Sequence, residues 1–278
     1  MSVPLACPIC LRPFRGPLLC AACARSFPQR GPYTDLTLSG SGSGSFAEKA
    51  PPQSTSLFQN PLISFAYERG WRRSFSWAGF PGEEAEFKQA QHWLVKAASG
   101  GVLLDASCGS GLFTRRFAAS SDYAAVIGLD YSAAMLLEAD ERMRASLPSA
   151  TPVTLIRADV ARLPFATGSI DAVHAGAALH CWPAPGAAMA EVSRVLKPGG
   201  VFVASTFLDP TAPLGEVIGD AVVLPFAQAL GAQQSSSYRW WNETELRDLC
   251  TMVGLTALER IRSRQFIMFK CTKPGAVI

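Results

Sequence analysis

The chain has 278 residues, of which 49% are hydrophobic and 17% are charged, and its formal net charge is +3. This length and apolar content predict a sizeable core, either one large domain or one domain with a small appendage. The net charge is too small to indicate nucleic-acid binding by itself. No apolar run approaches the ~18 residues of a transmembrane helix, so the sequence predicts no membrane-spanning segment.

The first 23 residues contain four of the eight cysteines. They form two C-x2-C pairs separated by nine residues, namely Cys7, Cys10, Cys20 and Cys23. Two such pairs can complete a tetrahedral thiolate site, which predicts a structural Zn2+ in a small zinc-ribbon-like unit over residues 1–38. Two disulfides or unligated thiols are the alternatives. The scattered remaining cysteines favour a reducing compartment with one metal site.

A Ser- and Gly-rich stretch follows this unit, so residues 39–60 are predicted to be a linker. Residues 61–278 are predicted to form a second domain, in which helices and strands alternate from residue 81 onwards. Helices are predicted over 81–99, 112–120, 187–196 and 243–253, with one more that Ser132 caps. Strands are predicted over 102–105, 125–130, 153–158, 170–175, 201–207, 255–262 and 265–271.

This alternation predicts an α/β fold with a Rossmann-like, doubly wound sheet of seven strands. The turn between the last two strands is short, and a short turn joins only antiparallel neighbours. The last strand should therefore run antiparallel to an otherwise parallel sheet.

Asp105 and Asp130 end the first two predicted strands, and Asp159 directly follows the third. The first of them leads into a turn in which Gly109 and Gly111 let the backbone bend and a ligand approach closely. Ligands of such sheets bind beyond the carboxyl ends of the strands, and an acid about twenty residues after the turn suits ribose hydroxyls. The pattern predicts a nucleoside-containing cofactor; the alternative is that each acid merely caps a turn.

Four stretches resemble the class I S-adenosylmethionine-dependent methyltransferases of the type 11 kind. They are LLDASCGSG at 103–111, IGLDYS at 127–132, RADV at 157–160 with LPF at 163–165, and EVSRVLKPGG at 191–200. The resemblance covers about residues 85–271 and implies S-adenosylmethionine as cofactor. It implies that residues of the first stretch hold the methionine end, those of the second the ribose, and those of the third the adenine. The cofactor-binding residues implied in this way are Asp105, Ser107, Gly109, Gly111, Asp130, Tyr131, Asp159 and Val160.

Ser107 departs from the pattern, because that family has glycine at this place. A variant turn that adds a hydroxyl is the favoured interpretation, since both later glycines remain. Weakened cofactor binding is the alternative, and it would turn the chain into a zinc-bearing interaction protein that keeps only the fold.

Two aromatic-rich segments, 61–82 and 208–241, are predicted to cover the site as lids. They favour a flat or apolar acceptor; the alternative is that these aromatic side chains only pack in the core and the lids. Tyr67, Trp71 and Trp182 are the predicted acceptor-binding residues. His180 follows the fourth predicted strand of the second domain, where a neutral imidazole could accept a proton from the acceptor; a purely structural role for His180 is the alternative.

The stretches PLISFAYERGW at 61–71, FPG at 80–82 and ALHCWP at 178–183 resemble plant and algal chloroplast methyltransferases, which are related to the C-methyltransferases of quinone biosynthesis. This likeness implies a plastid location and a small apolar or aromatic acceptor, such as a quinone or prenyl-lipid, with peripheral contact to lipid surfaces. The four-cysteine unit also resembles that of rRNA guanine methyltransferases, so an RNA base is the alternative acceptor. The modest charge speaks against it.

Overall fold

The computed structural model describes residues 3–14, 16, 18–38, 75–146, 151–218, 223 and 239–275. Its strands in the second domain are β5 (Val102–Ala106), β6 (Ala125–Asp130), β7 (Val153–Arg157), β8 (Ile170–Ala175), β9 (Leu196–Phe207), β10 (Thr256–Ser263) and β11 (Phe266–Thr272). Its α-helices are α4 (Glu83–Ala98), α5 (Leu112–Ser120), α6 (Ala133–Ser146), α7 (Pro185–Val195), α8 (Ala212–Ile218) and α10 (Glu243–Met252). The short helices η4 (Phe75–Ala78), η5 (Val160–Arg162) and η6 (Leu179–Cys181) lie in the connections.

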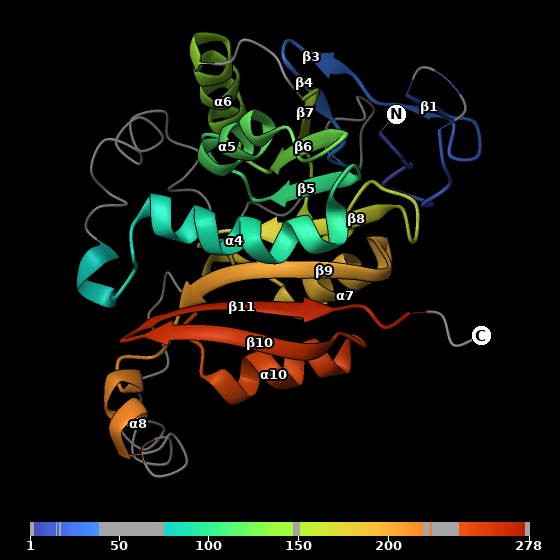
Figure 1. Cartoon of the computed structure of the whole chain (residues 1–278). Helices are drawn as coiled ribbons and strands as arrows, with labels where there is room; N and C mark the ends of the chain where they lie inside the picture. The colour runs from blue at the N-terminus through green and yellow to red at the C-terminus, as the bar shows by residue number, and fades with distance from the viewer. Residues whose placement is uncertain are drawn as a thin grey trace.

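The seven strands lie in the order β10-β11-β9-β8-β5-β6-β7 (Figure 1). The pairs among β5 to β9 are parallel, whereas β11 is antiparallel to both of its neighbours. The predicted α/β sheet with an antiparallel last strand is therefore confirmed. Apolar side chains fill both faces of the sheet: α7 and α10 contribute to the core on one face, and α4 and α5 to the core on the other.

Two further strands, β3 (Gln29–Arg30) and β4 (Tyr33–Asp35), extend this sheet beyond β7. β4 pairs with β7 in parallel, and β3 pairs with β4 as an antiparallel edge. The short pair β1 (Leu19–Cys20) and β2 (Arg25–Ser26) stands beside the four cysteines. The N-terminal unit therefore contributes two strands to the central sheet in addition to its own small hairpin.

The start of the chain also contacts the loop that follows η5. The main-chain N–H of Ala6 donates to Pro164 O at 2.8 Å, and the N–H of Ala166 donates to Pro4 O at 3.2 Å. The N-terminal unit is thus joined to the second domain at the end of β7 and again along residues 164–166.

The predicted linker 39–60 and the residues Tyr67 and Trp71 lie outside the described part of the chain. The division at residues 1–38, 39–60 and 61–278 stays a prediction. None of the described helices is long and apolar enough to cross a membrane.

Candidate cofactor and acceptor site

The turn between β5 and α5 contains three residues with left-handed backbone: Ser107 (φ 61°), Gly109 (φ 56°) and Gly111 (φ 77°). A Cβ added to Gly109 would meet no atom within 4 Å, so this side of the turn faces open space. A Cβ added to Gly111 would lie 3.0 Å from the Cβ of Ala139 on α6. Gly109 therefore leaves room for a ligand, whereas Gly111 is needed for helix packing.

Asp130, at the end of β6, contacts this turn directly. Its Oδ2 accepts the main-chain N–H of Gly109 at 2.8 Å, and its Oδ1 accepts the N–H of Ser132 at 2.8 Å. Burial raises the pKa of Asp130, although these two backbone hydrogen bonds oppose the rise. The predicted glycine turn and Asp130 therefore lie together at the carboxyl ends of β5 and β6.

Asp105 lies beneath the turn and is buried. Thr114 donates its hydroxyl to Oδ2 at 2.5 Å, and His174 Nδ1 lies 2.7 Å from Oδ1. Both carboxylate oxygens therefore have protein partners, and the contact of Asp105 with the methionine end stays a prediction. The pairing of His174 with Asp105 was not predicted, because strand periodicity gives the face of a residue but not its partner on another strand.

The third acid, Asp159, caps η5 by accepting the main-chain N–H of Ala161 at 2.8 Å. Its side chain is exposed, whereas Val160 is buried. Nearby, the Arg157 guanidinium lies 5.4 Å from the centroid of the Tyr131 ring and donates to Tyr131 O at 3.0 Å. The residues predicted to contact ribose and adenine thus follow the neighbouring strands β6 and β7.

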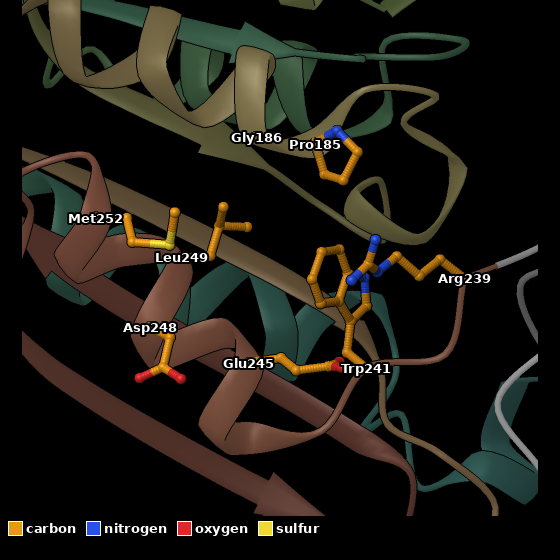
Figure 2. A pocket seen from close by; sticks show the side chains of 8 residues that line it. All are labelled: Pro185, Gly186, Arg239, Trp241, Glu245, Asp248, Leu249 and Met252. Atoms are coloured by element: carbon orange, nitrogen blue, oxygen red, sulfur yellow. The ribbon is translucent and has the colours of Figure 1, made fainter. Parts of the chain in front are cut away.

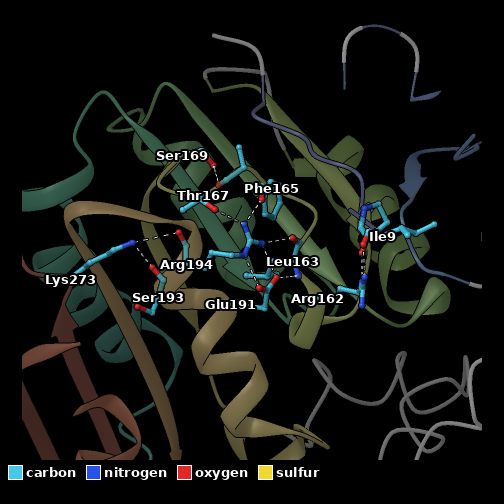
Figure 3. Close-up of polar contacts among 12 residues, drawn as sticks. Ile9, Arg162, Leu163, Phe165, Thr167, Ser169, Glu191, Ser193, Arg194 and Lys273 are labelled. Atoms are coloured by element: carbon cyan, nitrogen blue, oxygen red, sulfur yellow. Dashed lines mark hydrogen bonds and ion pairs between the residues drawn. The ribbon is translucent and has the colours of Figure 1, made fainter. Parts of the chain in front are cut away.

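The N-terminal unit contacts both ends of this region. Asp35, which is buried, accepts a hydrogen bond from Arg157 Nη1 at 3.1 Å. Arg162, at the end of η5, donates through Nη2 to Ile9 O at 2.7 Å and through Nε to Pro8 O (Figure 3). Pro8 and Ile9 lie between Cys7 and Cys10, so the first cysteine pair is attached to η5 by its main chain.

The loop after η5 is held by the first residues of the EVSRVLKPGG stretch. Arg194 donates to Leu163 O and Phe165 O, each at 2.8 Å, and Glu191 accepts the N–H of Leu163 at 2.7 Å (Figure 3). Arg194 and Glu191 also pair with each other at 2.7 Å. Two motifs that are distant in sequence therefore form one network that fixes the loop 163–165.

In the loop after β8, which the sequence predicts to face the acceptor, His180 is buried in η6, and its Nδ1 lies 3.3 Å from the hydroxyl of Thr206. Burial lowers the pKa of His180 to about 3, so its imidazole is neutral at pH 7. The role of His180 as a base stays a prediction. The neutral ring can accept a hydrogen bond, but with its lowered pKa it is a weak base. Trp182, also buried, donates its indole N–H to the hydroxyl of Ser107 at 3.0 Å.

An aromatic cluster surrounds the end of β9. The Phe207 ring centroid lies 4.7 Å from that of Phe80, 4.8 Å from that of His180 and 6.0 Å from that of Trp240. Phe266 joins the cluster at 4.6 Å from Phe80. Phe80 belongs to the first predicted lid and Trp240 to the second, so the described ends of both lid segments meet here.

A surface hollow lies between the start of α7 and helix α10 (Figure 2). The Arg239 guanidinium lies 4.3 Å from the centroid of the Trp241 ring, and the N–H of Arg239 donates to His180 O at 3.0 Å. The hollow therefore adjoins η6, but it shares no residue with the glycine turn. It is lined by Pro185, Gly186, Arg239, Trp241, Glu245, Asp248, Leu249 and Met252.

The thiols of Cys7, Cys10, Cys20 and Cys23 all lie within 4.8 Å of one another. A tetrahedral Zn–S distance of about 2.3 Å places neighbouring sulfurs about 3.8 Å apart, so the cluster fits this metal. The Cys10 and Cys20 sulfurs are 3.5 Å apart, and all eight cysteines are free thiols. The four side chains thus meet as the spacing predicts, and no disulfide joins them.

The family model described as "Methyltransferase domain" matches residues 104–204. An uncharacterized chloroplastic methyltransferase of Arabidopsis thaliana is 47% identical over 92% of this chain and 70% of its own length. The chain belongs to the S-adenosylmethionine-dependent methyltransferases. The solved structure of a phosphoethanolamine N-methyltransferase of Haemonchus contortus with bound S-adenosylhomocysteine has a similar fold, with a TM-score of 0.59 and 17% sequence identity. The match covers 83% of this chain and 62% of the Haemonchus chain. The demethylmenaquinone methyltransferase of Desulfitobacterium hafniense is 27% identical to this chain. The match covers 71% of this chain and 76% of the relative's length.

Proposed function

We propose that this methyltransferase acts on a small aromatic acceptor that carries ring hydroxyls, of the quinol class, inside the plastid. The observation that carries the proposal is the aromatic cluster in which Phe207 contacts Phe80, Trp240 and His180, because flat apolar rings are suited to binding another ring. The distant demethylmenaquinone methyltransferase relative supports the same acceptor class, and the chloroplastic name of the Arabidopsis relative supports the location.

In this proposal the cofactor lies across the carboxyl ends of β5, β6 and β7. Asp130 accepts hydrogen bonds from the ribose hydroxyls, and Asp159 with Val160 contacts the adenine. The turn that contains Ser107 and Gly109 faces the methionine end, above Asp105. These roles are supported by the open space beside Gly109 and by the position of Asp130 against the turn.

The sulfonium of the bound cofactor is a strong methyl donor, so the protein mainly has to align the acceptor atom with the methyl group and the sulfur. The acceptor forms its bond to the methyl carbon while the carbon–sulfur bond breaks and its electron pair stays on sulfur. A quinol methylated at a ring carbon then loses the proton of that carbon to solvent water, which restores the aromatic ring. In this proposal the neutral imidazole of His180 orients the acceptor through a hydrogen bond with a ring hydroxyl.

The four N-terminal cysteines are proposed to bind a structural Zn2+. Four thiolates fill a tetrahedral site, so the metal would have no open position for chemistry. Its contribution would be to fold the N-terminal unit, which is too small to bury much apolar surface alone.

The test is transfer of a labelled methyl group from S-adenosylmethionine to a prenylated naphthohydroquinone, a prenylated benzohydroquinone and total RNA. Labelling of a quinol supports the proposal. Labelling of RNA alone would replace the proposed acceptor with an RNA base. A heat of binding for S-adenosylhomocysteine, measured by calorimetry, tests the cofactor site independently of the acceptor.

A further inference from the structure

Ser107 occupies a backbone conformation that favours glycine. Its φ is 61°, within the left-handed region, where a side chain with a Cβ is disfavoured. Strained residues persist only where their surroundings fix them, and they gather at functional sites. The hydroxyl of Ser107 makes a contact that a glycine could not make.

That contact is the hydrogen bond from Trp182 Nε1 to Ser107 Oγ, at 3.0 Å. Trp182 is 6% exposed, so its indole N–H has little access to water and needs a protein partner. A glycine at position 107 would relieve the backbone but would leave this N–H without its acceptor. The hydroxyl therefore has a specific use at a place where the turn itself prefers glycine.

The two residues belong to different parts of the site. Ser107 lies in the turn that would face the cofactor, whereas Trp182 directly follows η6, two residues after His180. This hydrogen bond joins two residues that are 75 positions apart in the sequence, and it links the turn directly to the loop after β8. A movement of the turn on cofactor binding would be transmitted through this bond to the loop that carries His180.

We propose that Ser107 is a positioning residue, which couples cofactor binding on the glycine turn to the local stability of the acceptor-side loop 177–184 through Trp182. The inference rests on the proposed cofactor site. Its consequence is that the loop that would meet the acceptor opens less often when the methyl donor is already bound.

The test compares Ser107→Gly and Trp182→Phe with the wild-type protein. Both variants remove the hydrogen bond, one by deleting the acceptor and one by deleting the N–H while keeping a ring. Ser121→Gly is the matched control, because Ser121 also has left-handed backbone (φ 60°) but lies at the far end of α5. Binding of S-adenosylhomocysteine is measured by calorimetry, and hydrogen exchange of residues 177–184 is measured with and without this ligand.

In the wild-type protein and in Ser121→Gly, S-adenosylhomocysteine should slow hydrogen exchange of residues 177–184. In Ser107→Gly and Trp182→Phe the ligand should still bind, with a Kd about 2- to 10-fold higher, but should no longer slow exchange of that loop. A purely structural hydrogen bond would change exchange equally with and without ligand. Ligand-dependent protection of the same size in both variants would overturn the coupling, while the proposed cofactor site would stand. Absence of binding to the wild-type protein would overturn both.

Discussion

The guanidinium of Arg162 donates to the main-chain oxygen of Ile9 at 2.7 Å, so the first cysteine pair holds the helix η5 that follows Asp159. Arg162 also donates to Pro8 O, and both acceptor residues lie between Cys7 and Cys10. The positions of these two main-chain oxygens therefore depend on the conformation of the cysteine pair. A metal bound by this pair would therefore support the adenine side of the proposed cofactor site.

Replacing Cys7 and Cys10 by serine should remove the bound zinc and should weaken S-adenosylhomocysteine binding about fivefold, as loss of about 1 kcal/mol would. Metal analysis and calorimetry on the same samples check the two effects. Arg162→Met should weaken the ligand similarly while the zinc content stays unchanged. Arg144→Ala is the control, because Arg144 is an exposed residue whose ion pair with Asp140 lies on α6. Unchanged affinity in both Arg162→Met and the cysteine variant would contradict the role of the N-terminal unit.

The central fold could be predicted because its elements carry strong local patterns. The buried run of β5 and the helical stripe of α7 each indicate their own type and approximate bounds, and the short turn before β11 decides its direction. The strands β3 and β4 have two and three residues, which is too short for any periodicity, and β4 pairs with a strand more than a hundred residues away. Their place in the sheet could not be predicted from a local pattern.

In the candidate site, too, some features could be predicted from the sequence and others could not. The acids at strand ends and the glycines of the turn could be predicted, because the topology of a parallel sheet brings strand ends together. The pairings of His174 with Asp105 and of Trp182 with Ser107 could not, because each depends on the packing of segments 69 and 75 residues apart. The sequence indicated that Ser107 was unusual, but only the structure shows which group uses its hydroxyl.

Cofactor affinity should depend on the charge of Asp130. Ribose hydroxyls donate hydrogen bonds to the ionised carboxylate, so protonation weakens the binding. Burial raises the pKa of Asp130. The loss of cofactor affinity should therefore begin at a higher pH than it would for an aspartate with the ordinary pKa of about 3.9. Calorimetry with S-adenosylhomocysteine between pH 7.5 and 4.5 should show affinity falling as the pH falls. Asp130→Asn should bind more weakly at pH 7.5 and show a flatter profile. A fall of equal steepness in this variant would assign the pH dependence to another group.

His180 should make the folded protein sensitive to acid. Its pKa is lowered to about 3 in the folded state, whereas an unfolded imidazole takes up its proton near pH 6.5. Below pH 6.5 the unfolded chain therefore binds a proton that the folded chain does not, and stability falls by up to about 1.4 kcal/mol per pH unit. His180→Gln should remove this part of the decline in urea unfolding between pH 7 and 5. His92→Gln, at an exposed position of α4, is the matched control. An identical decline in His180→Gln would show that the imidazole of His180 is protonated in the folded state.

The two glycines of the turn should respond differently to alanine. Gly109→Ala adds a Cβ into open space, so its cost to stability is the left-handed backbone alone, about 1–2 kcal/mol, while the new methyl group occupies the space left for the cofactor. The affinity of the Gly109→Ala variant for S-adenosylhomocysteine should fall tenfold or more, which corresponds to about 1.4 kcal/mol.

Gly111→Ala adds the same backbone strain and also places its Cβ 3.0 Å from the Cβ of Ala139, so the stability of this variant should fall by a further ~1–3 kcal/mol. Urea unfolding and calorimetry on both variants separate the two effects. Equal losses of stability, with unchanged ligand affinity in Gly109→Ala, would mean that the cofactor does not approach this turn.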